Sequence, residues 1–370
     1  MRPDVFECVT KPLFAIAFNR LQNILMREIE QQLKAGKNLS TAQVKTVAAF
    51  LLDANPEPET KVAVLRALAQ KGETAEEIAT FVNEFLAQAI DPRIDAADLP
   101  GPILDVVGTG GDKLNLFNVS STAMFILSAG GVCVVKHGNR GITSKSGGAD
   151  VLETLGVKIN LPPVDLARSV KEVGFGFIFA PLYHPAFKAV AEARRRLAAE
   201  GQRSIFNILG PLLNPARPDH QLVGVYDENL VPVFANILKQ LGRKAAWVVH
   251  GSTEEGQGMD ELSTLGPNKV AYLAGDNVEM MTLKPADYGF AKATLAELAG
   301  GEVTENAEIL EGILAGRLKG AKRDLAVFNA AAGFVIVGKA KHLTEGRAMA
   351  EDLINRGAAH AKLRAVIDWC

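Results

Sequence analysis

The sequence predicts an α/β protein: a small all-helical N-terminal domain and a larger α/β domain with a mostly parallel central sheet. Two observations support this prediction. Residues 20–93 place apolar side chains at helical spacing and show no strand pattern. From residue 103, short apolar runs alternate with glycine-rich loops and helices, as in parallel sheets. We therefore expect an extension and helical domain over residues 1–100, joined by a segment near 190–215, and an α/β domain over 101–370.

Capping residues mark the helices of the first region. Ser40, with a glutamine three residues later, forms a capping-box pattern before an apolar run. Thr74 opens a further helix after Gly72, a residue suited to ending the preceding one. The linker Asp91–Gly101 closes the domain. Residues 1–20 carry no clear pattern and are expected to form a peripheral extension.

The second region alternates between strands and helices. Short apolar runs predict strands at residues 103–107, 132–136, 175–181, 221–226 and 244–251. Helical patterns occupy residues 122–131, 148–156, 184–201 and 229–242, and a mostly helical tail begins near residue 305. Because ligands bind at the carboxyl ends of such strands, we expect the loops there to carry the site.

The composition of the chain limits the classes of protein to which it can belong. The chain has 370 residues, of which 48% are hydrophobic and 22% are charged, as in ordinary globular proteins. A net charge of −2 gives no broad basic field for nucleic acid or an anionic membrane. Cys8, Cys133 and Cys370 are scattered and predict neither a disulfide framework nor a metal cluster. No signal peptide or membrane-length apolar run is evident, so a cytoplasmic enzyme without a membrane partner is expected.

The prediction of function rests mainly on the stretch from Asp105 to Glu153. It contains GTGGD at 108–112, NVSS at 118–121, KHGNR at 136–140 and then SKSGG at 144–148. Glycine lets backbone N–H groups approach a ligand, and a helix N-terminus favours an anion. Three such loops in succession predict a polyphosphate site.

Each of these loops also has a plainer interpretation. GTGGD matches neither the dinucleotide fingerprint nor the P-loop, and a glycine-rich turn is the alternative. In NVSS, the hydroxyl groups could bind phosphate oxygens and Mg²⁺, or a single residue could simply cap the following helix.

Lys136 and the adjacent carboxylates also have two interpretations each. Lys136, beside Gly138, is expected to bind phosphate, although a solvated basic turn is the alternative. His137 is interpreted as a structural residue. The adjacent carboxylates of Asp260 and Glu261 are either an acidic surface turn or a Mg²⁺ site that bridges to pyrophosphate.

Taken together and in order, these motifs resemble those of the anthranilate phosphoribosyltransferases. The series GTGGD, NVSS, KHGNR, SKSGGADVLETLG, HPAFK, RSIFNILGPLLNP and GMDELS resembles that family from end to end. LSTAQVKTVAAFLL and KGETAEEI resemble its helical N-terminal region, so the resemblance covers about residues 25–370. Each motif alone is weak, but the ordered set is highly specific.

The resemblance implies a fold, a reaction and partners. The fold would be similar to that of the pyrimidine nucleoside phosphorylases, as a homodimer formed through the helical domain. The reaction would be the Mg²⁺-dependent transfer of a 5-phosphoribosyl group from phosphoribosyl pyrophosphate to the amine of anthranilate, in tryptophan biosynthesis. Two Mg²⁺ ions per active site are expected.

Site roles follow from the same resemblance, residue by residue. The phosphoribosyl pyrophosphate would be held by Gly108, Gly111, Asp112, Asn118, Ser120, Ser121 and Lys136. Anthranilate would be bound by Gly108, Asn139, His184 and Arg194, with Arg194 paired to its carboxylate. The Mg²⁺ ions would be bound by Ser120, Asp260 and Glu261.

The residue types suit this chemistry. Negative charge grows on the leaving pyrophosphate, and Mg²⁺, Lys136 and loop N–H groups can stabilise it. The aniline nitrogen is already unprotonated at neutral pH, so we assign no single acid or base residue. Two other functions are the alternatives: a nucleoside phosphorylase or a transferase of this fold with another acceptor, and a non-catalytic nucleic-acid-binding relative. The carboxylate pair at Asp260 and Glu261 argues against the first, and the net charge of −2 against the second.

Three positions depart from the usual pattern of the family. Gly148 stands where the family usually has serine, which removes one hydroxyl group from the donor site. NVSS replaces the more usual NVST and keeps the hydroxyl group. The stretch AAEGQ at 198–202 is about three residues longer than the usual link, and it follows Arg194 closely enough to re-aim it.

Overall fold

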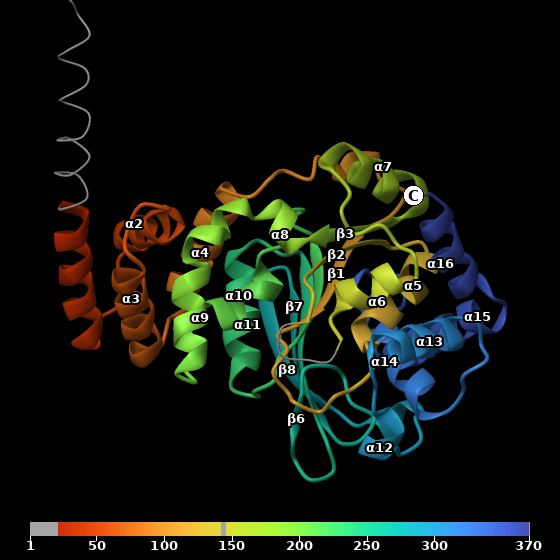
Figure 1. Ribbon diagram of the computed structural model, residues 1–370. Coiled ribbons are helices and arrows are strands. Elements are labelled where there is room, and N and C mark those ends of the chain that lie inside the picture. Colours follow the sequence, from red (N-terminus) through yellow and green to blue (C-terminus); the bar gives the residue numbers. More distant parts are fainter. Residues whose placement is uncertain (1–20, 142–145, 370) are drawn as a thin grey trace, which may run out of the picture. The chain divides into compact units, whose positions relative to one another are not determined.

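The computed structural model describes residues 21–141 and 146–369 (Figure 1). The extension expected at residues 1–20 lies outside the described residues, as do Ser144 and Lys145 of the third loop. The chain divides into two compact units. The first contains the residues up to Ala89 together with Pro185–Leu209, and the second contains Ile90–His184 and the chain from Gly210 onward.

The described part of the first unit is helical. Residues 21–34 form its first helix. The other elements are α2 (Thr41–Leu52), α3 (Pro58–Lys71), α4 (Ala75–Ala87), the 3₁₀ turn η2 (Pro185–Val190), α9 (Ala191–Ala199) and α10 (Phe206–Leu209). The capping box predicted at Ser40 forms, and Thr74, predicted only to open a helix, forms another. Each satisfies backbone N–H groups that the first turn of a helix leaves without partners.

The second unit is built on one mixed sheet. Its parallel strands are β1 (Ile103–Gly108), β2 (Cys133–Gly138), β3 (Phe175–Phe179), β4 (His220–Gly224) and β5 (Ala245–Ser252). The antiparallel additions are β6 (Gly258–Met259), β7 (Asn268–Ala274) and β8 (Asn277–Leu283). The order is β3-β2-β1-β4-β5-β7-β8, with β6 paired to β5. The predicted fold class is therefore confirmed.

Helices cover both faces of this sheet (Figure 1). On one face, α5 (Val119–Ala129) packs on β1 and β2, and α14 (Ala321–Ile336) packs on β4 and β5. On the other face, α7 (Pro163–Val173) buries Leu166 and Val170 in a cluster with Val135 and Ile178. Alternate strand residues thus face two separate apolar layers, as a doubly covered sheet requires.

The remaining helices of the second unit are shorter or lie further along the chain. They are α6 (Gly148–Thr154), α8 (Ala180–Tyr183), α11 (Leu230–Gln240), α12 (Leu295–Leu298), α13 (Val303–Leu314), α15 (Leu343–Asn355) and α16 (Ala358–Trp369). Short 3₁₀ turns complete it at η1 (Ala96–Asp98), η3 (Gly210–Leu212) and η4 (Pro285–Tyr288).

Two details differ from the sequence prediction. The hairpin β7–β8 was not expected, and it extends the parallel sheet with antiparallel strands. The single helix expected over residues 184–201 is instead the 3₁₀ turn η2 followed by α9. A 3₁₀ turn at the start of a helix is common, because its tighter hydrogen bonds suit a helix end.

Within residues 21–141 and 146–369, none of the helices combines the length and the apolar character that crossing a bilayer would need.

Candidate functional site

The candidate site lies at the carboxyl ends of three neighbouring strands of the second unit, β2, β1 and β4. β1 ends at Gly108 and β4 at Gly224, and these two glycines are register partners. β2 lies on the other side of β1 and ends at Gly138. Because these strands are parallel, the residues that follow them gather at their carboxyl ends, as the sequence analysis expected.

Asp260 crosses the ends of β1 and β4 where only glycine leaves room for it. A Cβ atom added to Gly224 would lie 1.5 Å from the carbonyl oxygen of Asp260. One added to Gly108 would lie 2.3 Å from Oδ2 of the same residue. The N–H of Gly110 donates a 2.6 Å hydrogen bond to that Oδ2. The glycine loop GTGGD therefore holds the Asp260 carboxylate, which is 150 residues away in the chain.

Glu261 is held by the second loop. The N–H of Ser120 donates a 3.2 Å hydrogen bond to Oε1 of Glu261. Ser120 lies in the first turn of α5, where N–H groups lack partners within the helix and the helix dipole favours negative charge. The NVSS loop and the GMDELS segment are thus joined by a charged hydrogen bond.

Lys136 joins the third loop to the other two. Its side chain is buried, with 5% of the residue exposed. The ammonium group donates hydrogen bonds to the carbonyl oxygen of Val106, on β1, and to Oγ of Ser120 at 3.2 Å. Ser120 is therefore the point at which Lys136 and Glu261 meet.

Burial perturbs the ionisation of this cluster. It raises the pKa of Asp260, and the nearby charge of Asp112 raises it further. It also raises the pKa of Glu261, with a further contribution from Asp260. Burial lowers the pKa of Lys136, while Asp105, Glu261 and Asp260 oppose that shift. All these shifts have one physical cause: several carboxylates share a poorly solvated space with one ammonium group.

A divalent cation of the magnesium type fits this donor set. Oxygen ligands surround the space, and the perturbed carboxylates need a positive partner. In the described part of the chain, no three His, Cys, Asp or Glu side chains form a ready-made metal cage. Mg²⁺ commonly binds one or two carboxylates and completes its shell with water and substrate phosphate.

The backbone of the first loop adopts an uncommon conformation. Gly110 and Gly111 have φ of 69° and 92°, and the non-glycine residues Lys113 and Asn115 have φ of 61° and 51°. Asp112 lies between them, and its Oδ1 accepts a hydrogen bond from the Leu114 N–H at 3.3 Å. Such left-handed residues are stable only where surrounding structure holds them, and they often accompany binding sites.

The side chain of Asn118 does not cap the helix that follows it. The residue occupies the N-cap position of α5, but its side chain makes no capping bond. Instead it exchanges hydrogen bonds with Ser146, whose Oγ donates to Oδ1 of Asn118 at 3.1 Å. A Cβ atom added to Gly148 would lie 3.2 Å from Oγ of Ser121 and 3.8 Å from Cε of Lys136. Gly148 thus faces two of the residues predicted to bind the donor.

The residues predicted to bind the donor and the metal therefore come together in the second unit. The predicted acceptor residues are more dispersed. Asn139 follows β2, is exposed, and accepts a 2.8 Å hydrogen bond from the Arg140 N–H. His184 is buried, and its Nε2–H donates to the carbonyl oxygen of Leu213 at 2.9 Å. Arg194 lies on α9 of the first unit, so its predicted role stays a prediction.

His137 pairs with His184 in a way that the sequence did not indicate. The two rings meet edge to face, with their centres 5.2 Å apart. Nδ1–H of His137 donates to the carbonyl oxygen of Gly210 at 3.2 Å. Burial, aided by His184, lowers the pKa of His137 to about 3, and burial also lowers the pKa of His184. Both rings are therefore neutral at physiological pH.

Two further buried polar residues support the site and were missed. Asp105 on β1 is fully buried, and burial raises its pKa to about 6 against the influence of Lys136. Asn329 on α14 accepts a hydrogen bond from the Leu262 N–H and donates one to its carbonyl oxygen, both at 3.0 Å. It fixes the chain directly after Glu261. A signal existed for both, since each is a lone polar residue inside an apolar run.

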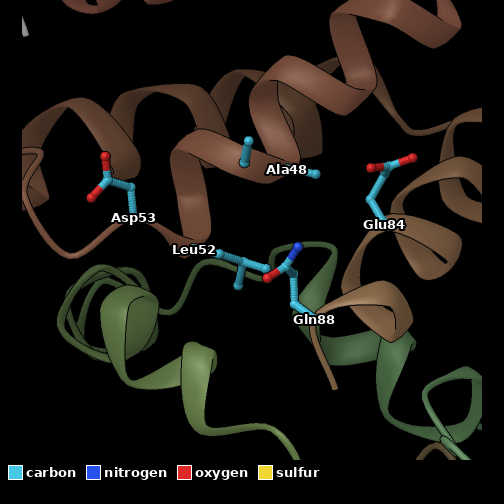
Figure 2. Close-up of a pocket in the computed structure, with 6 residues that line it drawn as sticks. Ala48, Leu52, Asp53, Glu84 and Gln88 are labelled. Carbon is cyan, nitrogen blue, oxygen red and sulfur yellow. The ribbon is translucent and has the colours of Figure 1, made fainter. Parts of the chain in front are cut away.

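A separate hollow lies in the first unit, between α2 and α4 (Figure 2). Its walls are formed by Ala48, Ala49, Leu52, Asp53, Glu84 and Gln88. None of the predicted site residues is among them. We assign this hollow no role in the candidate site.

Comparisons with known proteins agree with this geometry. Residues 100–360 match the model of the glycosyl transferase family, a/b domain. The chain is 42% identical to the anthranilate phosphoribosyltransferase of Moorella thermoacetica over 335 residues, which cover 90% of this chain and 95% of the relative. It superposes on the crystal structure of the Thermus thermophilus enzyme of that name with a TM-score of 0.84 and 36% identity, covering 92% of this chain and 98% of the other. The Saccharomyces cerevisiae enzyme, in complex with phosphoribosyl pyrophosphate and Mg, matches with a TM-score of 0.82 and 27% identity, covering 93% and 97%.

The close packing at the strand ends gives a first prediction. Replacing Gly224 with alanine should displace Asp260, because the new Cβ would overlap its carbonyl oxygen at 1.5 Å. We expect the free energy of unfolding, measured by urea denaturation, to fall by about 1–3 kcal/mol. Gly210→Ala is the control, since a Cβ there meets no atom within 4 Å. Equal unfolding midpoints for the two variants would contradict the packing argument.

Proposed function

Because this chain belongs to the anthranilate phosphoribosyltransferases, we propose that it transfers the 5-phosphoribosyl group of phosphoribosyl pyrophosphate to the amine of anthranilate. The products are N-(5-phosphoribosyl)anthranilate and pyrophosphate, in a Mg²⁺-dependent step of tryptophan biosynthesis. The observation that carries the proposal is the cluster of Lys136, Asp260 and Glu261 around Ser120, in which Lys136 and Asp260 are buried. The structural relative in complex with phosphoribosyl pyrophosphate and Mg supports it.

The donor would bind against the three loops of the second unit. Lys136 and the N–H groups at the start of α5 supply positive charge for phosphate oxygens. Gly110 and Gly111 adopt a left-handed backbone conformation that suits glycine. Because glycine has no side chain, the backbone of this loop can approach a ligand closely. The proposed donor residues are Gly108, Gly111, Asp112, Asn118, Ser120, Ser121 and Lys136.

Asp260 and Glu261, with Ser120, would hold two Mg²⁺ ions. When bound, Mg²⁺ neutralises charge on the pyrophosphate as it leaves. The protein's part is to hold both carboxylates in place: the N–H of Gly110 donates to Asp260, and the N–H of Ser120 donates to Glu261. These hydrogen bonds reduce the reorganisation needed when donor and metal bind.

Anthranilate would be bound by Gly108, Asn139, His184 and Arg194. Arg194 suits a carboxylate because it makes no ion pair with any residue in the described chain, and burial alone lowers its pKa. His184 donates to a carbonyl oxygen and is neutral, so it can line an aromatic ring without adding charge. No strong base is needed, since the aniline nitrogen is unprotonated, and holding the two substrates together supplies much of the acceleration.

The first helix supports the proposed homodimer. Leu21, Ile24 and Leu25 are 67%, 48% and 41% exposed, and they form an apolar surface on the helical domain. We propose that a second copy of the chain covers this surface. Sedimentation equilibrium should give twice the mass of one chain, and replacing Ile24 and Leu25 with glutamate should give the monomer. A monomeric wild-type protein at micromolar concentration would refute the proposed dimer.

Substitution of the two metal-binding carboxylates tests the reaction. Anthranilate is fluorescent, so its consumption with phosphoribosyl pyrophosphate and Mg²⁺ can be followed directly. The wild-type chain should consume it. Asp260→Asn combined with Glu261→Gln should lower turnover about 100-fold or more, because charge on the leaving group is no longer neutralised, while the fold stays intact.

A pair of surface carboxylates supplies the matched control. Glu254 and Glu255 are exposed, and Glu254→Gln with Glu255→Gln should leave turnover close to that of the wild type. Absence of turnover in the wild type, with donor binding intact, would refute anthranilate as the acceptor. Near-normal activity of the Asp260 and Glu261 variant at limiting Mg²⁺ would refute the metal role.

Gly148 gives a prediction specific to this chain. A serine there would place its side chain beside Ser121 and Lys136. We expect Gly148→Ser to lower the KM for phosphoribosyl pyrophosphate about twofold to tenfold, as one added hydrogen bond would. Gly148→Ala is the control, because it adds the Cβ without the hydroxyl group. If both variants change the KM equally, the hydroxyl group is not the cause.

A further inference from the structure

Helix α9 belongs to the second stretch of the first unit and carries Arg194. The first stretch of that unit meets it through α3, which packs along α9. The two helices are far apart in the chain, and three side chains of α3 make polar contacts with α9 or the residues that flank it. Glu59 accepts a hydrogen bond from Nη1 of Arg196, within α9, at 2.5 Å. Lys61 and Arg66 contact the residues at its two ends.

Lys61 makes the buried contact. The residue is 1% exposed, and its ammonium group donates hydrogen bonds only to backbone carbonyl oxygens among the contacts described. Two of these belong to Leu51 and Asp53, at the end of α2. The third belongs to Ala189, 2.7 Å away in the turn that leads into α9. A buried charge is tolerated only when it is well hydrogen-bonded. The Lys61 ammonium group therefore needs all three carbonyl groups, and it holds them close together.

Arg66 makes the surface contact, further along α3. Its guanidinium group donates to Oε1 of Gln202 at 2.9 Å and to Oε2 of Glu200 at 2.5 Å. Both acceptors belong to the stretch 198–202. Gly201, between them, has φ of 69° and turns the chain back. This stretch is therefore tied to α3, and α9 is held at both ends.

Arg194 itself lies against a cluster of aromatic rings. Its guanidinium carbon is 5.0 Å from the centre of the Phe206 ring. Phe206 stacks on Phe85, with ring centres 5.6 Å apart, and Phe187 meets both rings edge to face. Phe187 lies in the same turn as Ala189, the residue that Lys61 holds. A shift of that turn would move both α9 and one ring of the cluster.

We propose that Lys61 and Arg66 are positioning residues that hold α9 at its two ends and thereby aim Arg194 at the carboxylate of the acceptor. The inference rests on the proposed function, since it assigns the acceptor to Arg194. It also assigns a role to the stretch at 198–202. That stretch supplies the two acceptors through which Arg66 fixes the far end of the helix.

Steady-state kinetics of four variants test this proposal. Lys61→Met removes the buried ammonium group, Lys61→Arg keeps a cation, and Arg66→Met removes the surface contact. Lys45→Met is the control, because Lys45 is an exposed lysine of the same unit, with 58% of its side chain accessible, paired to Glu84 at 3.4 Å. The KM for anthranilate, the KM for phosphoribosyl pyrophosphate and kcat are measured for each variant.

The expected result is a split between the two substrates. Lys61→Met should raise the KM for anthranilate about tenfold, since small misplacements of a positioning group have large effects. Arg66→Met should raise it less, Lys61→Arg should restore part of the loss, and Lys45→Met should match the wild type. The KM for phosphoribosyl pyrophosphate should stay within about twofold throughout, as expected when only acceptor contacts are lost. A merely structural role would lower the active fraction and leave both KM values unchanged.

Hydrogen–deuterium exchange separates this proposal from the proposed function. Amides of residues 185–199 should exchange faster in Lys61→Met and Arg66→Met than in the wild type and Lys45→Met. If the wild type consumes no anthranilate but this exchange change is seen, the proposed function has failed while the hold on α9 stands. Unchanged exchange and an unchanged KM for anthranilate in Arg66→Met overturn the inference, even if Lys61→Met does not fold.

Discussion

The backbone of Asp260 passes over the ends of β1 and β4, and the candidate site depends on that close approach. Glycine at 108 and 224 leaves room for it, because a Cβ at either position would overlap Asp260. Parallel pairing places these two glycines side by side. The crossing brings Asp260 to the N–H of Gly110 and Glu261 to the first turn of α5. Segments far apart in the sequence thereby form one group of acceptors.

The same crossing places more negative than positive charge at the candidate site. Asp260 and Glu261 share a buried space with Asp112, and Lys136 is the cation that faces them. One ammonium group does not balance these carboxylates in a poorly solvated space. A divalent cation would restore the balance, and a Mg²⁺-bound pyrophosphate would bring its own counterions. The cluster therefore favours a substrate that arrives with metal ions.

Sequence reasoning predicted the loops well because parallel strands bring their carboxyl ends together whatever lies between them. The glycine and hydroxyl residues of GTGGD and NVSS, and Lys136, follow from the sequence pattern alone. It could not show that Asn118 contacts Ser146 instead of capping α5, since both uses suit the same residue. The hairpin β7–β8 was missed because β8 is an edge strand that exposes Val278 and Met280, so its apolar residues do not mark a buried face. Lys61 was equally hidden: a lysine within a helix normally lies in water, and only packing shows that this one does not.

A crystal structure of the chain with phosphoribosyl pyrophosphate, Mg²⁺ and anthranilate tests the central claim most directly. We predict metal density beside the carboxylates of Asp260 and Glu261. We also predict pyrophosphate oxygens within hydrogen-bond distance of Lys136 and the N-terminus of α5. Phosphoribosyl pyrophosphate bound elsewhere, or bound here with no metal beside Asp260 and Glu261, would contradict the proposed site.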